Sequence, residues 1–115
     1  MTKWIYYTKD GKFEIGFVSI HTILWHELHR LDGPAIISPI GNMEWYQNGK
    51  LHRLDGPACV WYDGSKEWFQ NGKPHRIGGP AAEYKSGKKH WYVFGKKITE
   101  EEHNKGEVYL RLTYV

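Results

Sequence analysis

The apolar residues of this chain fall in short runs that alternate with polar residues, and a period of two is typical of β-strands. The runs are bounded by Gly, Pro, Asn and Asp, and the 3.6-residue period of an amphipathic helix is nearly absent. The pattern predicts a mostly β fold with three strand pairs: 34–39 with 43–48, 57–62 with 66–71, and 80–85 with 89–94.

These strand pairs belong to a unit of 23 residues that occurs three times, at 29–51, 52–74 and 75–97. The first and second copies are identical at 14 of 23 positions, and the second and third at 10 of 23, without insertion or deletion. All three copies contain His-Arg, Gly-Pro-Ala, a central Gly, Trp and Gly-Lys. Asn48-Gly49 and Asn71-Gly72 are signals for type I′ turns, so we expect each unit to form roughly one β-hairpin.

Two aromatic rows follow from the alternation of side chains along a strand. We expect Trp45, Trp68 and Trp91 on one face and Tyr46, Phe69 and Tyr92 on the other. The Trp row is interpreted as core, because identical burial in each unit would fix the register between hairpins. The second row is the better binding candidate, and its charged neighbours are Glu44, Glu67 and His90. Packing of this row against a terminal helix is the alternative.

The ends of the chain differ from the units and are interpreted as caps of a single domain over residues 1–115. Residues 4–19 predict a hairpin that turns at Asp10-Gly11, within an N-terminal cap of residues 1–28. The C-terminal cap, 98–115, begins with a capping box at Thr99 and predicts a short helix to about Lys105, followed by a final strand over 108–115. The predicted architecture is an elongated antiparallel meander.

Composition supports a folded chain, since 16% of the residues are aromatic and 40% are hydrophobic. The net charge of +3 and the pI near 8.9 are too mild to indicate nucleic acid by themselves. The single cysteine, Cys59, excludes an internal disulfide and suits a reducing compartment. Because no apolar run approaches 18 residues, we expect no membrane span and a cytoplasmic location. An exposed β edge also makes a homodimer plausible.

The pattern His-Arg-x-Asp-Gly-Pro-Ala, then a Gly, then Trp-Tyr/Phe-x-Asn-Gly-Lys occurs at 29–50 and again at 52–73. It resembles the MORN-like β-hairpin repeats, above all a variant common in bacteriophage and giant-virus proteins that is related to MORN-like antitoxin repeats. The third copy departs from it at Gly78 and at Val93-Phe94. The resemblance covers residues 29–97 and implies an elongated sheet that is a platform for protein or lipid contact. For a phage-type protein it implies a host protein, such as a defence factor, as partner, and the host cytoplasm as location.

The repeated His-Arg-x-Asp is the most enzyme-like feature, because a His beside a carboxylate and an Arg suits acid–base or phosphoryl-transfer chemistry. A catalytic site is needed once, however, so its repetition favours structural bonds, with Asp55 capping turn amides and His52 bonding a carbonyl of a neighbouring hairpin. His21, His26 and His29 have a helical spacing within strand-like sequence, which disfavours a metal site. The sequence therefore predicts no metal, no cofactor and no enzyme; a His-dependent hydrolase or nuclease is the weaker alternative.

Nucleic acid or a nucleotide is the main alternative to a protein partner. Aromatic rings can stack on bases, and two basic ladders have a 23-residue interval that suits phosphates: Arg30, Arg53 and Arg76, and Lys50, Lys73 and Lys96. The acidic residues Glu44 and Glu67 beside the aromatic row count against this hypothesis. The leading prediction is a non-enzymatic binding protein that engages a partner protein through an aromatic sheet surface.

Overall fold

The computed structural model of the chain describes residues 3–16 and 21–106. The N-terminal cap is a hairpin of β1 (Lys3–Thr8) and β2 (Gly11–Gly16), which confirms the predicted turn at Asp10-Gly11. A 3-10 turn, η2 (Trp25–Glu27), directly precedes the first unit. The predicted hairpin extended to residue 19, but residues 17–20 lie outside the described part of the chain.

Each of the first two units contributes two neighbouring strands to the main sheet and a smaller pair beyond it, whereas the third contributes three strands to the main sheet. In the first unit these strands are β3 (Ile36–Ile37), β4 (Met43–Glu44), β5 (Tyr46–Gln47) and β6 (Lys50–Leu51). In the second they are β7 (Cys59–Val60), β8 (Lys66–Glu67), β9 (Phe69–Gln70) and β10 (Lys73–Pro74). In the third they are β11 (Ala82–Glu83), β12 (Lys89–Val93) and β13 (Lys96–Ile98).

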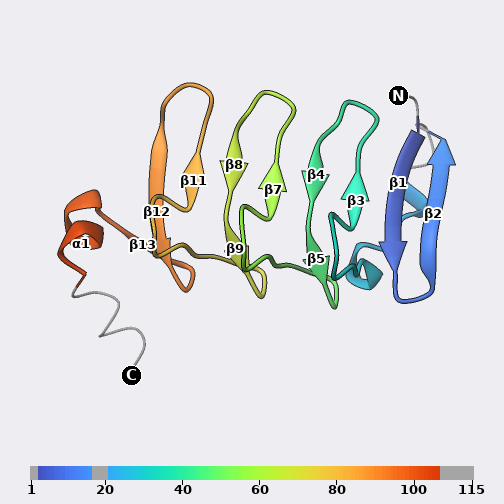
Figure 1. Ribbon diagram of the computed structural model, residues 1–115, viewed down its shortest axis with the longest axis horizontal. Helices are drawn as coiled ribbons and strands as arrows, with labels where there is room; N and C mark the ends of the chain where they lie inside the picture. Colours follow the sequence, from blue (N-terminus) through green and yellow to red (C-terminus); the bar gives the residue numbers. More distant parts are fainter. Residues whose placement is uncertain (1–2, 17–20, 107–115) are drawn as a thin grey trace.

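The main sheet is antiparallel, and its nine strands lie in the order β13-β12-β11-β8-β7-β4-β3-β1-β2 (Figure 1). The protein measures 47 × 32 × 22 Å, and its radius of gyration of 15.6 Å exceeds the value of about 13 Å expected for a compact domain of this length. The predicted mostly β, elongated meander is therefore confirmed. Within the described residues, no helix is long and apolar enough to cross a membrane.

The predicted six-residue strands are wrong in two respects. The strands within 34–39, 57–62 and 80–85 are only two residues long, and 43–48 and 66–71 are each divided at their Trp. Met43 and Glu44 pair with β7 of the next unit, whereas Tyr46 and Gln47 pair with β6 of their own unit. At the change of partner, the Trp45 amide donates to the carbonyl of Ala58 and the Trp45 carbonyl accepts from the His52 amide. Both backbone polar groups of Trp45 are therefore hydrogen-bonded, but the regular ladder of hydrogen bonds between two strands is interrupted.

The predicted type I′ turns are confirmed by their backbone angles. Asn48 and Gly49 have φ values of 52° and 76°, and Asn71 and Gly72 have values of 50° and 79°. The third copy keeps this conformation with Phe94 in place of Asn, at φ 47°. A bulky residue rarely adopts a positive φ, and the Phe94 ring stacks on His75 with ring centroids 4.1 Å apart.

The C-terminal cap contains α1 (Glu100–Lys105), which begins at the predicted capping box: the Glu102 amide donates to the Thr99 hydroxyl, and the Thr99 amide donates to the Glu102 carboxylate. Gly106, in the left-handed conformation, follows the helix. The final strand predicted for 108–115 lies outside the described residues.

Among the described residues, two clusters of buried hydrophobic side chains lie toward the ends of the sheet, and Ala58, Cys59, Ala81 and Ala82 are buried outside them. The first contains Ile23, Leu28, Ala35, Ile36 and Tyr46, and the second contains Val93 and Ile98 with Trp91 packed against them. Trp45 and Trp68 are half-buried and belong to neither cluster. The Trp row was predicted to be the core, and this is wrong for these two residues, whose rings are covered by arginine side chains instead.

Candidate binding surfaces

One face of the sheet carries the predicted Glu44, Glu67 and His90. Residues directly opposite each other on neighbouring strands share a face, and the pairing registers connect Ile36, Glu44, Cys59, Glu67, Ala82 and His90 in one row. Tyr46, Phe69 and Tyr92 lie two residues further along their strands and therefore on the same side. We call this side the Glu–Tyr face, and the opposite side, with Trp45 and Trp68, the Arg–Trp face.

Tyr46 was predicted to be part of an open binding surface, and this is wrong because its side chain is buried. Its exposed fraction is 9%, and it is buried with Ile23 and Leu28, while the Trp25 ring lies 6.3 Å away. These contacts come from the segment that precedes the first unit, not from the terminal helix. Phe69 and Tyr92 in the next two units stay half-buried.

The rest of the Glu–Tyr face is an aromatic surface, which we call the open patch. It comprises Trp61, Glu67, Phe69, Tyr84, His90 and Tyr92. The Trp61 indole N–H donates to Glu67 at 3.1 Å, and the Tyr84 and His90 rings meet edge to face at 5.9 Å. These contacts hold the patch, and α1, which lies at the β13 end of the sheet, approaches it along β12 (Figure 1).

Glu44 and Cys59 lie beside the open patch but are more deeply placed. Burial raises the pKa of the Glu44 carboxyl, although the Tyr46 hydroxyl donates to it at 3.2 Å. Burial also raises the pKa of the Cys59 thiol, which makes it a poor nucleophile. In the described part of the chain, no three His, Cys, Asp or Glu side chains gather where they could hold a metal ion.

On the Arg–Trp face, the arginine at the second position of each unit covers an aromatic ring of the preceding unit or, in the first unit, of the N-terminal cap. The guanidinium carbon lies 3.9 Å from the Tyr7 ring centroid for Arg30, 4.0 Å from Trp45 for Arg53, and 3.8 Å from Trp68 for Arg76. The Nη1 atoms also donate to the carbonyls of Pro34, Pro57 and Pro80. The side chains are only 24–27% exposed. The three arginines predicted to bind a ligand are thus engaged by the fold.

The carboxylate beside each arginine occupies one of two positions. Asp32 and Asp55 accept from the Nε of Arg30 and Arg53, and their side chains are 87% and 89% exposed. The hydrogen bond from Arg30 lowers the pKa of Asp32. In the third unit Gly78 replaces the Asp, and Arg76 pairs with Glu83 at 3.2 Å. Asp55 was predicted to cap turn amides. In the structure its carboxylate instead accepts a hydrogen bond from Arg53.

The histidine of each unit accepts a backbone hydrogen bond from a residue 19 positions later. The Nδ1 atoms of His29, His52 and His75 accept from the amides of Asn48, Asn71 and Phe94 at 3.0, 3.0 and 2.9 Å. The predicted structural role involved a carbonyl, whereas the partner is the amide of the type I′ turn. An accepting Nδ1 requires a neutral imidazole, and burial lowers the pKa of His75.

The x position of His-Arg-x-Asp is a further exposed feature that the predicted binding residues do not include. Leu31, Leu54 and Ile77 occupy it, with exposed fractions of 74%, 75% and 56%. Two open grooves, of about 670 and 520 Å³, lie between successive loops that carry these residues. The available signal was that an aliphatic residue stands in all three copies of an otherwise polar loop.

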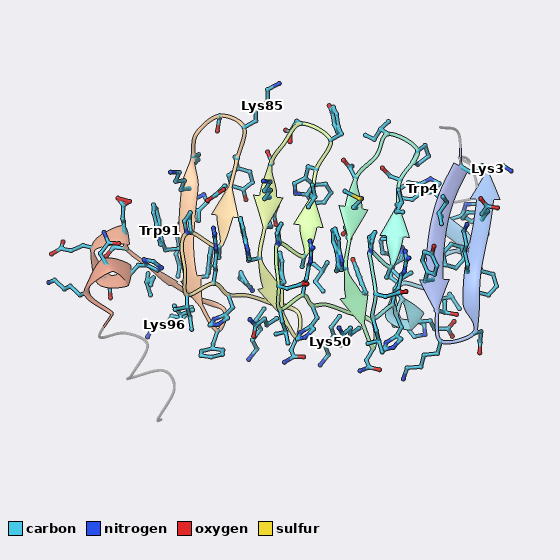
Figure 2. All side chains as sticks on the ribbon, viewed as in Figure 1. Lys3, Trp4, Lys50, Lys85, Trp91 and Lys96 are labelled. Atoms are coloured by element: carbon cyan, nitrogen blue, oxygen red, sulfur yellow. The ribbon has the colours of Figure 1, made fainter. Side chains whose placement is uncertain are left out.

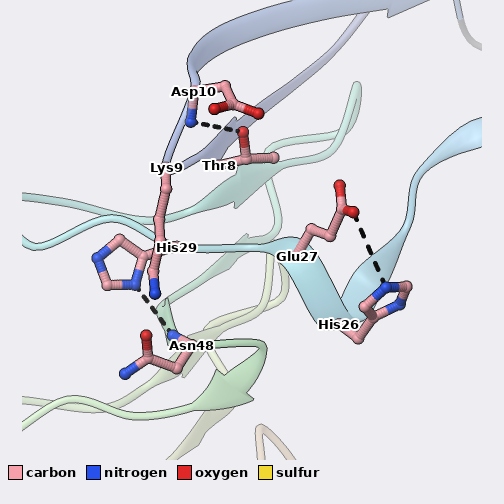
Figure 3. A pocket seen from close by; sticks show the side chains of 7 residues that line it. All are labelled: Thr8, Lys9, Asp10, His26, Glu27, His29 and Asn48. Atoms are coloured by element: carbon pink, nitrogen blue, oxygen red, sulfur yellow. Dashed lines mark hydrogen bonds and ion pairs between the residues drawn. The ribbon is translucent and has the colours of Figure 1, made fainter.

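A third depression, of about 330 Å³, lies between the β1–β2 turn and the first unit (Figure 3). Its lining includes Asp10, His26, Glu27 and His29. His29 Nδ1 is already bonded to the Asn48 amide, and His26, 3.9 Å from Glu27, has a side chain 78% exposed to solvent.

Comparison with known proteins found no match among family models, curated proteins or solved structures.

Proposed function

We propose that this protein is a non-enzymatic, MORN-like repeat protein that binds a partner protein through the open patch of its Glu–Tyr face. The observation that carries the proposal is the contrast between Tyr46, which is buried, and Phe69 and Tyr92, which occupy the same place in their units and stay half-buried. Rigid aromatic side chains beside charged groups are typical of protein-binding surfaces, because they supply contact area at little entropic cost.

The non-enzymatic part of the proposal is supported by the engagement of the enzyme-like motif. In every unit the His Nδ1 accepts from a turn amide and the Arg covers a ring, so the same groups are used three times for the same structural purpose. The resemblance of the units to phage and giant-virus repeats supports a host protein as the partner.

Nucleic acid is a second candidate because of the charge of the third unit. Residues 75–97 contain six Lys and Arg but a single Glu, whereas basic and acidic residues are equal in number in each of the first two units. The basic side chains are divided, however: Lys85 lies at one end of the strands and Lys96 at the other (Figure 2). Binding that weakens steeply as salt is added would favour this candidate.

The test is affinity capture from host lysate, with and without nuclease treatment, by the wild-type protein and the double variant Phe69→Ser/Tyr92→Ser. Tyr62→Ser is the matched control, since Tyr62 is 71% exposed in a turn outside the patch. Circular dichroism verifies that the variants fold. We expect a nuclease-resistant partner that is retained by the control and lost by the double variant. A partner retained by both variants, or lost on nuclease treatment, contradicts the proposal.

A further inference from the structure

The two grooves on the Arg–Trp face are equivalent to each other. The first is lined by Leu31, Trp45, Gln47 and Leu54, and the second by Leu54, Trp68, Gln70 and Ile77. Each residue of the second groove therefore lies 23 positions after its counterpart in the first. Arg53, Leu54 and Asp55 line both, so this loop is the shared wall between the two grooves.

The two leucines on the groove walls contribute little to the packing of the fold. Leu31 and Leu54 are about three-quarters exposed, and a side chain left in water contributes little hydrophobic stabilisation. The second and third units are identical at only 10 of 23 positions, and Ile77 nevertheless keeps an aliphatic side chain at this place. The three side chains stand at the same place in successive loops and form a row of exposed aliphatic groups along the two grooves.

The spacing of the grooves selects the conformation of a molecule that enters both. Successive units are displaced by two strands, because β4 lies between β3 and β7, and two strand spacings amount to about 9.6 Å. A polyproline II helix rises about 9.3 Å in three residues and completes one turn, so residues i and i+3 point the same way at this interval. In an extended β-strand, residues i and i+3 point to opposite sides and cannot enter both grooves.

The charge on the groove walls selects the composition. The Asp32 and Asp55 side chains are 87% and 89% exposed, whereas the neighbouring arginines are 24–25% exposed and lie against aromatic rings. The outermost charges of the first two loops are therefore negative. They attract Lys or Arg of a ligand and repel phosphates. Pro follows from the conformation, because its ring fixes φ near the polyproline II value.

From this we infer that the Arg–Trp face binds a basic, proline-rich protein segment in the polyproline II conformation, which crosses the loops and places residues i and i+3 in the two grooves. The site uses none of the residues of the open patch, so it is independent of the proposed function and adds a second, linear-motif interaction to it.

The test is fluorescence anisotropy with labelled synthetic peptides and the full chain. The probe carries Pro at positions i and i+3 and a Lys at each end. Matched peptides place the two Pro at i and i+2, replace both Pro by Gly, or replace both Lys by Glu. We expect the probe to bind about tenfold more tightly than each of the others, because only the probe combines spacing, preformed conformation and charge.

Protein variants locate the binding. Leu54→Ser removes the wall shared by both grooves, and we expect it to weaken probe binding about tenfold. Ile40→Ser is the matched control, since Ile40 is 61% exposed and lines neither groove, and it should leave the affinity unchanged. The inference is overturned if no peptide binds, if affinity does not depend on Pro spacing, if Ile40→Ser is as damaging as Leu54→Ser, or if a labelled single-stranded oligonucleotide displaces the probe.

Discussion

Arg53→Ala tests whether the His-Arg-x-Asp motif holds the fold together, and its cost can be worked from three contacts. The cation–π contact with Trp45 at 4.0 Å is worth about 0.5–2 kcal/mol. The charged hydrogen bond to the Pro57 carbonyl at 3.0 Å is worth about 1.5 kcal/mol, the low end of the usual range because the side chain is 25% exposed. The ion pair with the exposed Asp55 adds less than about 1 kcal/mol.

We therefore expect Arg53→Ala to lower the free energy of unfolding by about 2–4 kcal/mol, a large share of the roughly 6–17 kcal/mol typical of a chain of this size. The measurement is urea unfolding followed by circular dichroism, for the wild type, Arg53→Ala, Trp45→Ala and the double variant. The coupling free energy between the two sites should be about 1 kcal/mol. Lys12→Ala, an exposed basic residue of β2, is the control and should change little.

Two results would refute this reasoning. If Arg53→Ala lies within about 0.5 kcal/mol of the wild type, the contacts do not stabilise the fold. If the effects of Arg53→Ala and Trp45→Ala add without coupling, the arginine does not act through the ring. In either case the arginines would again become candidates for phosphate or for a catalytic role, as the sequence alone had allowed.

Three further variants test the turns, the histidines and the C-terminal cap. Gly49→Ala should destabilise far more than Gly41→Ala in urea unfolding: both glycines have positive φ, but an added Cβ overlaps the His26 carbonyl at Gly49 and meets nothing within 4 Å at Gly41; equal costs would contradict the close approach. The pKa of His75 is lowered by burial, so the unfolded state binds a proton first and the free energy of unfolding should fall as the pH drops below 6.5, with a smaller fall in His75→Gln; an unchanged slope in that variant would assign the effect to other groups. Thr99→Ala removes the capping box of α1 and should raise the hydrogen-exchange rate of its amides by an amount equivalent to about 1 kcal/mol, with no change in the main sheet; unaltered exchange would mean that α1 is held by packing alone.

Local chemistry explains which features of the fold could be predicted. The Asn-Gly turns, the Asp10-Gly11 hairpin and the Thr99 capping box depend on residues within a few positions of each other, and their outcome is visible in the sequence. Alternation also separated the Tyr and Trp rows correctly. It could not show which row would be covered, because Tyr46 is buried by Ile23 and Leu28 from outside its own unit.

The same limit applies to the candidate site. In the sequence, the arginines form a regularly spaced row of charges that suits a ligand. Nothing in a linear sequence shows that Arg53 lies over an aromatic ring of the preceding unit. The division of the strands at Trp45 depends on a change of partner between units, which the six-residue run does not reveal. Contacts between units, rather than within them, account for most of the differences from the predictions.

The divergence of the third unit separates structural positions from those that remain for binding. Where Gly78 removes the Asp, Glu83 supplies a carboxylate to Arg76 from another strand. Where Phe94 replaces Asn at a positive φ, its ring stacks on His75 and its amide keeps the hydrogen bond. These losses are compensated, as expected for groups that the fold needs. An aliphatic residue follows Arg in all three copies with more than half of its surface in water, and the contact that we infer for the grooves gives these side chains a role.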